Sequence, residues 1–137
     1  MEYLKLIELT GGLLAKLLGL KKDRKIEVAG YLDNIADTLA KFPVRVRAGA
    51  PYEELAGLSK QAADYASKFR DATTDVLSRS EADSFAGELE EAHNAKAALV
   101  NEPASDRDER LRVISEIAGS LRVAAATLRG SASQLRR

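Results

Sequence analysis

Residues 111–135 read LRVISEIAGSLRVAAATLRGSASQL, and their apolar side chains recur at intervals of three and four positions. This spacing places the apolar side chains along one side of an α-helix. The positions that form the repeat are Leu111, Ile114, Ala118, Leu121, Ala125, Leu128, Ala132 and Leu135. A repeat sustained over so many turns is typical of a helix that packs lengthwise against other helices. The segment therefore predicts an all-α fold built as a helical bundle.

Four segments toward the N-terminus also show helical patterns. They are residues 2–20, 23–42, 51–77 and 80–100. Pro43 is expected to end the second helix, because proline lacks the backbone N–H that continues a helix. The later connections are short, so consecutive helices should run antiparallel. We expect a single helical domain over residues 1–137, with an antiparallel up-down four-helix bundle in 23–136 and an additional leucine-rich N-terminal helix in 1–20.

Two serine–aspartate pairs show the spacing of a capping box, the motif that satisfies free backbone N–H groups at the start of a helix. These pairs are Ser80 with Asp83, and Ser105 with Asp108. They predict where the fourth and the last helix begin.

The composition argues against several classes of function. The chain has 137 residues, 21 basic and 21 acidic side chains, and no cysteine. Without cysteine, neither a disulfide scaffold nor a thiolate metal site can form, and the expected location is the cytoplasm. Balanced charge gives no overall field that would attract nucleic acid, so nucleic acid is not the expected partner.

The sequence offers little catalytic chemistry. Its only histidine, His93, follows Glu90 at the Glu-x-x-His spacing of di-iron bundles, but such a site needs two of these motifs. No stretch has the glycine-rich pattern of a phosphate-binding loop. We therefore expect no catalytic, metal or cofactor site, no small-molecule substrate and no enzymatic activity.

The first helix carries more apolar surface than a peripheral helix needs. Its candidate residues for self-association or partner binding are Leu13, Leu14, Leu17 and Leu18. A basic group that could engage anionic lipid follows directly, formed by Lys21, Lys22, Arg24 and Lys25. Three interpretations stay open for this helix: burial in the chain's own core, docking on a partner or a second copy, and attachment to a membrane.

Arginines supply a second set of candidate contact residues. Arg122, Arg129 and Arg136 recur every seventh residue along one flank of the last helix. Residues at this place commonly form ion pairs between helices. They are therefore expected either to pair within the chain, with the acidic fourth helix as the nearest source of carboxylates, or to face the solvent. The alternative is that they bind a partner or a nucleic-acid backbone.

The linker 43–50 is expected to be extended, which would place Arg45 and Arg47 on one side of it. Two basic side chains on an exposed connection could hold an acidic partner, because loops often carry binding residues. The alternative is a plain connection whose valines, Val44 and Val46, cover the end of the bundle.

Three stretches carry a family resemblance: KKDRKIEVAGYLDNIADTLAKF, RAGAPYEELAGLSKQAADYASKF and LRVISEIAGSLRVAAATLRGSA. Their shared pattern falls at Tyr31–Leu39, Gly49–Pro51, Tyr65–Ala66 and Ala118–Arg129. In this pattern the chain resembles a group of small bacterial all-helical domains that accompany signalling and conflict (antiphage) systems. The resemblance implies an accessory or adaptor role in such a system, and it brings no catalytic residues.

These observations favour a non-enzymatic helical module that acts by interaction or oligomerisation, with a protein partner or a second copy of itself. The alternative is a membrane-targeting or membrane-perturbing effector that uses its amphipathic N-terminal helix.

Overall fold

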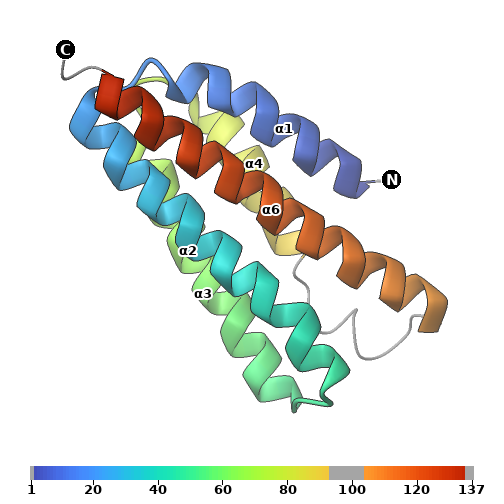
Figure 1. Cartoon of the computed structure of the whole chain (residues 1–137). Helices are drawn as coiled ribbons and strands as arrows, with labels where there is room; N and C mark the ends of the chain where they lie inside the picture. Colours follow the sequence, from blue (N-terminus) through green and yellow to red (C-terminus); the bar gives the residue numbers. More distant parts are fainter. Residues whose placement is uncertain (1, 93–103, 135–137) are drawn as a thin grey trace.

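The computed structural model describes residues 2–92 and 104–134, and these residues form helices joined by short turns (Figure 1). The helices are α1 (Glu2–Leu17), α2 (Lys22–Arg47), α3 (Tyr52–Ala72), α4 (Arg79–Ala92) and α6 (Ala104–Gln134). No strand occurs within these described ranges. The expected all-α class is confirmed.

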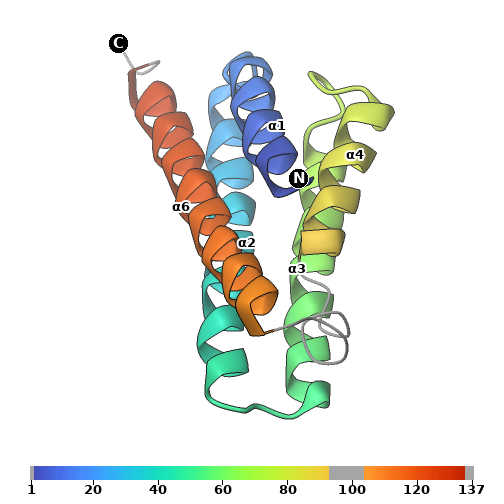
Figure 2. The same ribbon diagram turned by 90° about the vertical axis from the view of Figure 1, so that its right-hand side faces the viewer.

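The helices surround a common interior. α2 runs antiparallel to both α3 and α6 and packs against each of them (Figures 1 and 2). α3 also packs against α4, and α1 packs against both α4 and α6. The expected four-helix bundle with α1 as an added element is not confirmed, because α1 lies between α4 and α6.

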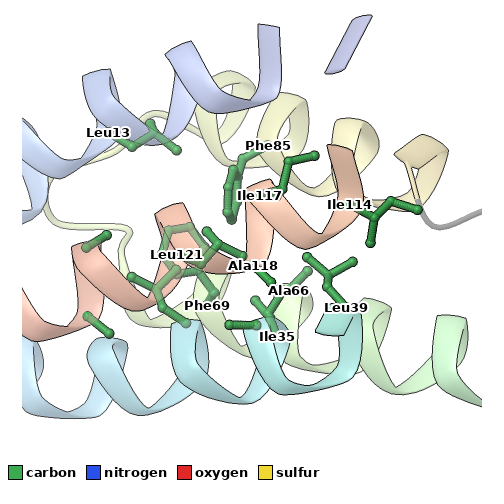
Figure 3. Close-up of a cluster of buried hydrophobic side chains, with 14 of the residues drawn as sticks. Leu13, Ile35, Leu39, Ala66, Phe69, Phe85, Ile114, Ile117, Ala118 and Leu121 are labelled. Atoms are coloured by element: carbon green, nitrogen blue, oxygen red, sulfur yellow. The ribbon is translucent and has the colours of Figure 1, made fainter. Parts of the chain in front are cut away.

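Every described helix contributes side chains to the core. Leu13 of α1, Phe69 of α3, Phe85 of α4 and Ile117 of α6 are all buried, as is Ile35 of α2 (Figure 3). The rings of Phe69 and Phe85 lie with their centroids 5.0 Å apart and their planes inclined by 48°, a favourable tilted arrangement. The two phenylalanines therefore link α3 to α4 near the middle of the core.

The apolar repeat of α6 is confirmed as a buried face. Its members from Leu111 to Ala132 are each at most 1% exposed. Leu135, the last member of the repeat, lies outside the described residues. The period of the apolar residues therefore identified the inner face of this helix, as expected for a helix whose stability comes from burying one side.

The first two helices are separated by a turn. α1 ends at Leu17, where the N–H groups of Gly19 and Leu20 donate to the carbonyls of Lys16 and Leu17 at 3.0 Å each. A Cβ atom at position 19 would stand only 3.2 Å from the carbonyl oxygen of Lys16. Glycine at this position allows the tight turn, which ends the helix three residues before the expected Leu20.

The expected end of the second helix at Pro43 is wrong. α2 continues through Pro43 to Arg47, although the proline removes one backbone donor and crowds the preceding turn. Phe42, Pro43 and Val46 are all buried, so packing of the last turns offsets this loss. The expected extended linker over 43–50 is therefore wrong as well, because residues 44–47 are helical.

α2 instead ends at Arg47, and Gly49, two residues further on, has a left-handed backbone with φ of 78°. The N–H of Gly49 donates to the carbonyl of Val46 at 3.1 Å, and the N–H of Ala50 donates to that of Arg45 at 3.0 Å. These two bonds form a Schellman cap, which satisfies the last carbonyls of a helix. Glycine adopts this backbone without the steric penalty of a side chain.

The capping box of the fourth helix lies two residues before the expected one. The side chain of Ser78 accepts the N–H of Glu81 at 3.1 Å, and the carboxylate of Glu81 accepts the N–H of Ser78 at 3.0 Å. The expected pairing of Ser80 with Asp83 is wrong, since α4 already begins at Arg79. α3 correspondingly ends at Ala72 rather than at Leu77. Ser105 does not precede α6, because that helix begins at Ala104.

Candidate interaction surface

Three leucines in the second half of α1, Leu13, Leu14 and Leu17, face the interior more than the solvent. Leu13 and Leu17 are only 4% and 2% exposed, and Leu14 packs partly buried against the same core. Leu18, in the turn after α1, is 37% exposed. Leu13 and Leu17 therefore do not form an external contact surface in this fold. Of the three interpretations, burial in the chain's own core describes these two side chains.

The basic group after α1 does not form one patch. Lys25 is 3% exposed, and its Nζ donates a hydrogen bond to Oγ of Ser131 on α6 at 2.7 Å. Arg24 pairs with Glu27 at 3.3 Å, while Lys21 is exposed and Lys22 half-buried. The expected lipid-binding role is therefore wrong for Lys25, because its amine points into the contact between α2 and α6.

Two of the three repeated arginines on α6 pair within the chain. Nη2 of Arg122 lies 3.0 Å from Oδ1 of Asp37, and Arg129 pairs with Asp33. Both carboxylates come from α2 rather than from the acidic fourth helix. Arg136 lies outside the described residues. Since three of the four side chains are exposed to solvent and Asp33 is half-buried, each pair contributes at most about 1 kcal/mol.

Arg45 joins the end of α2 to the start of α3. Its Nε donates to Oε2 of Glu54 at 2.6 Å and its Nη2 donates to Oε1 at 3.2 Å, a two-pronged pair that raises the pKa of the Arg45 guanidinium. Arg47 is exposed one position before the helix cap. The two arginines thus extend from a helical turn, and Arg45 has an intrachain carboxylate as its partner.

The junction of α2 and α6 carries exposed apolar side chains. Ile26 and Val44 of α2 are 45% and 62% exposed, and Val123 on the outer side of α6 is 65% exposed. We use the name α2–α6 seam for the exposed strip along this junction formed by Ile26, Asp33, Asp37, Val44, Arg122 and Arg129.

Each end of the seam is hollowed. One hollow of about 260 Å³ is lined by Asp37, Ala40, Lys41, Val44, Arg45 and Arg122. A second hollow of about 270 Å³ is lined by Lys22, Ile26, Arg129, Ala132 and Ser133. Both are open to solvent, and each has an exposed branched apolar side chain from α2 in its wall. The ion pair of Arg122 with Asp37 borders the first hollow, and Arg129 borders the second.

A sequence signal for the seam existed but depended on the length of α2. Ile26, Asp33, Asp37 and Val44 project within about 40° of one another at about 100° per residue. This alignment holds only if the helix continues through Pro43. A helix that ended at Phe42 would leave Val44 on an extended linker. The strip would then have no second apolar end.

Neither a membrane span nor a metal site is found in the described part of the chain. No helix there is both long enough and apolar enough to cross a bilayer. No three acidic or histidine side chains of residues 2–92 and 104–134 stand close enough to hold a metal ion. His93 lies outside these ranges, so the Glu-x-x-His motif has no described geometry.

Comparison with protein-family models, with curated proteins and with solved structures finds no match to this chain.

Proposed function

We propose that this protein is a non-enzymatic helical interaction module that binds protein through its α2–α6 seam. The observation that carries the proposal is the alignment of Ile26 and Val44 on one side of α2, each in the wall of a hollow. Single exposed apolar side chains are common on protein surfaces. Two that line hollows along one helix junction instead provide an elongated surface with apolar ends.

Helix formation alone does not account for these side chains. Isoleucine and valine are weaker helix formers than alanine, lysine or glutamate, so an exposed helical position gains nothing from them in propensity. In the interior of this fold, such residues are used for packing. Exposed at the seam, they favour a second surface that covers them, since burying a branched side chain contributes about 1.5–3 kcal/mol.

The charged residues of the seam suit a protein partner. Asp37 is already engaged by Arg122, and Asp33 by Arg129, so positive and negative groups balance one another in the strip without a large single-sign field. A single-sign field would favour nucleic acid or an anionic membrane. A strip that carries both signs favours a protein surface with a complementary arrangement of charges, because charge complementarity sets specificity and register.

The membrane-targeting alternative places greater demands on the fold. Insertion of α1 would withdraw Leu13 and Leu17 from the core and separate Lys16 from Glu81 of α4. Each leucine would lose about 1.5–3 kcal/mol of burial before any lipid contact compensates. The interaction module needs no such rearrangement and is therefore the preferred function.

The resemblance to bacterial helical domains extends the proposal to an accessory role in a signalling or antiphage system. Its support is the sequence pattern around Tyr31–Leu39 and Ala118–Arg129. In such a system the module would assemble other components rather than act on a substrate.

The test is site-specific crosslinking in cells that produce the protein. A photoreactive amino acid replaces Val44 in the seam, or Ala63 on the exposed side of α3 as the control. The expected result is a discrete protein adduct, either a second copy or another protein, from position 44 and not from position 63. Adducts with lipid alone, or equal adducts from both positions, would contradict the proposal.

A further inference from the structure

The seam consists of two parallel rows of opposite charge. Asp33 and Asp37 form a negative row on α2, and Arg129 and Arg122 form a positive row on α6. Because the two helices run antiparallel (Figures 1 and 2), Asp33 pairs with Arg129, and Asp37, further along α2, pairs with Arg122. The two rows therefore run side by side along the junction.

The apolar residues extend beyond the charges at both ends. Ile26 and Val44 are each nine positions from the buried Ile35, and Asp33 and Asp37 are each two positions from it. At about 1.5 Å per residue, the strip from Ile26 to Val44 is about 27 Å long. Along α2 the order is apolar, acidic, acidic, apolar.

We propose that the occupant of the seam is a second copy of this chain, related by a two-fold axis that runs along the seam. The inference rests on the proposed function and names its partner. Rotation about this axis places α2 of the second copy over α6 of the first without changing the level of any residue. Each acidic row then faces an arginine row, so that Asp33 opposes Arg129 of the other copy and Asp37 opposes Arg122.

The charges select this orientation over the other two-fold arrangement. An axis across the seam would place α2 on α2 and would bring Asp33 opposite Asp37 and Arg122 opposite Arg129. Like charges held face to face are unfavourable and act against such a pairing. An axis along the seam instead groups the same residues into sets of four charges, in which each aspartate lies next to arginines of both copies. It also brings Ile26 and Val44 of both copies together at the two hollows.

The size of the strip makes this a weak dimer. Two adjacent helices are about 20 Å wide, so a strip about 27 Å long covers about 500 Å² on each copy. The total of about 1,000 Å² lies at the lower bound for specific protein interfaces. The dimer should therefore form reversibly with concentration, with the apolar ends contributing affinity and the charge rows contributing orientation.

The experiment is sedimentation equilibrium of the full chain at concentrations from micromolar to millimolar. We expect the wild-type mass to rise toward that of a dimer, and Ile26→Asp and Val44→Asp to remain monomeric at the same concentrations. Tyr52→Asp is the matched control, because Tyr52 is an exposed large apolar side chain outside the seam. Circular dichroism checks that each variant keeps its helical content, as exposed positions should.

A charge exchange tests the orientation of the axis. Asp37→Arg alone places arginine against arginine both within the chain and across the axis, and should lower the dimer association constant at least tenfold. Adding Arg122→Asp restores opposite charges in both places and should restore the association constant. Failure of this rescue, while Val44→Asp still abolishes the dimer, would overturn the proposed axis.

Two outcomes overturn the second copy as the occupant. One is a wild-type chain that stays monomeric at millimolar concentration, and the other is a dimer that Val44→Asp leaves intact. Neither decides the proposed function, which is judged separately by crosslinking from position 44. If the wild-type chain stays monomeric, a crosslink from position 44 to another protein would support the proposed function, with that protein as the partner in place of a second copy.

Discussion

Lys16 at the end of α1 and Glu81 at the start of α4 form an ion pair that joins two helices far apart in the sequence. The same carboxylate accepts the backbone N–H of Ser78 at 3.0 Å and so completes the cap of α4. The lysine and this N–H together lower the pKa of Glu81 from 4.5 to about 2. One carboxylate therefore caps a helix and holds α1 in its place beside α4.

This pair should make the folded state sensitive to acid. A carboxyl whose pKa is lower in the folded than in the unfolded state stabilises the fold at pH values above its unfolded-state pKa. This contribution is lost as the pH falls through the folded-state pKa. For Glu81 the loss falls between about pH 4.5 and about pH 2. Thermal melts across this window should show a weaker pH dependence for Glu81→Gln and for Lys16→Met than for the wild type.

The double variant of Glu81→Gln and Lys16→Met serves as the control for this effect. It should show no further change relative to Glu81→Gln, because that substitution already removes the carboxylate from the pair. A pH dependence of Glu81→Gln that matches the wild type across the same window would count against the pair.

The burial of α1 predicts a sharp contrast between two neighbouring leucines. Leu17→Ala removes a buried side chain and should lower the free energy of unfolding by about 2–5 kcal/mol. Leu18→Ala, at a partly exposed position in the following turn, should cost less than about 1 kcal/mol. Chemical denaturation measures both values. Equal effects of the two substitutions would mean that α1 does not pack as the structure has it.

The buried amine of Lys25 predicts an asymmetry with its partner. Ser131→Ala removes the hydroxyl that accepts the hydrogen bond from Nζ, so a buried charged donor loses its bond at a cost of about 1–3 kcal/mol. Lys25→Met keeps the aliphatic stem and removes the charged group, so it should cost less than Ser131→Ala. Denaturant melts of both variants and of the double variant test this.

In the double variant the loss should be close to that of Lys25→Met alone. Once the amine is gone, the serine hydroxyl has no charged donor to satisfy. Additive losses would show that the two side chains act independently, contrary to the 2.7 Å contact.

The position where α2 ends predicts opposite effects of two alanine substitutions. Pro43→Ala should raise the free energy of unfolding by about 1 kcal/mol. The alanine N–H can continue the helix, and proline in a helix interior is about 3 kcal/mol less favourable than alanine. The loss of the packed proline ring offsets part of this gain. Gly49→Ala should lower it by about 1–2 kcal/mol, because alanine is strained in the left-handed backbone of the cap.

Thermal melts monitored by circular dichroism give both directions. If the helix ended at Phe42, Pro43→Ala would not stabilise it. A destabilising Pro43→Ala together with a neutral Gly49→Ala would therefore contradict the observed end of α2.

Part of the fold was readable from local pattern alone. The inner face of α6 follows from the spacing of Leu111 to Ala132, since a helix must bury its apolar side. The cap of α4 was also readable, because Ser78 followed by Glu81 is a better capping box than Ser80 followed by Asp83.

The sequence by itself determined that the chain is helical and which side of its last helix is buried, because these properties depend on residues within a few turns of one another. Tertiary structure decided that α2 passes through Pro43, that α1 fills the space between α4 and α6, and that the arginines of α6 pair with Asp33 and Asp37. Each of these depends on contacts between residues distant in the chain. The burial of Phe42 and Val46, and of Leu13 and Leu17, contributes more to stability than the local helix propensities that a sequence pattern reflects.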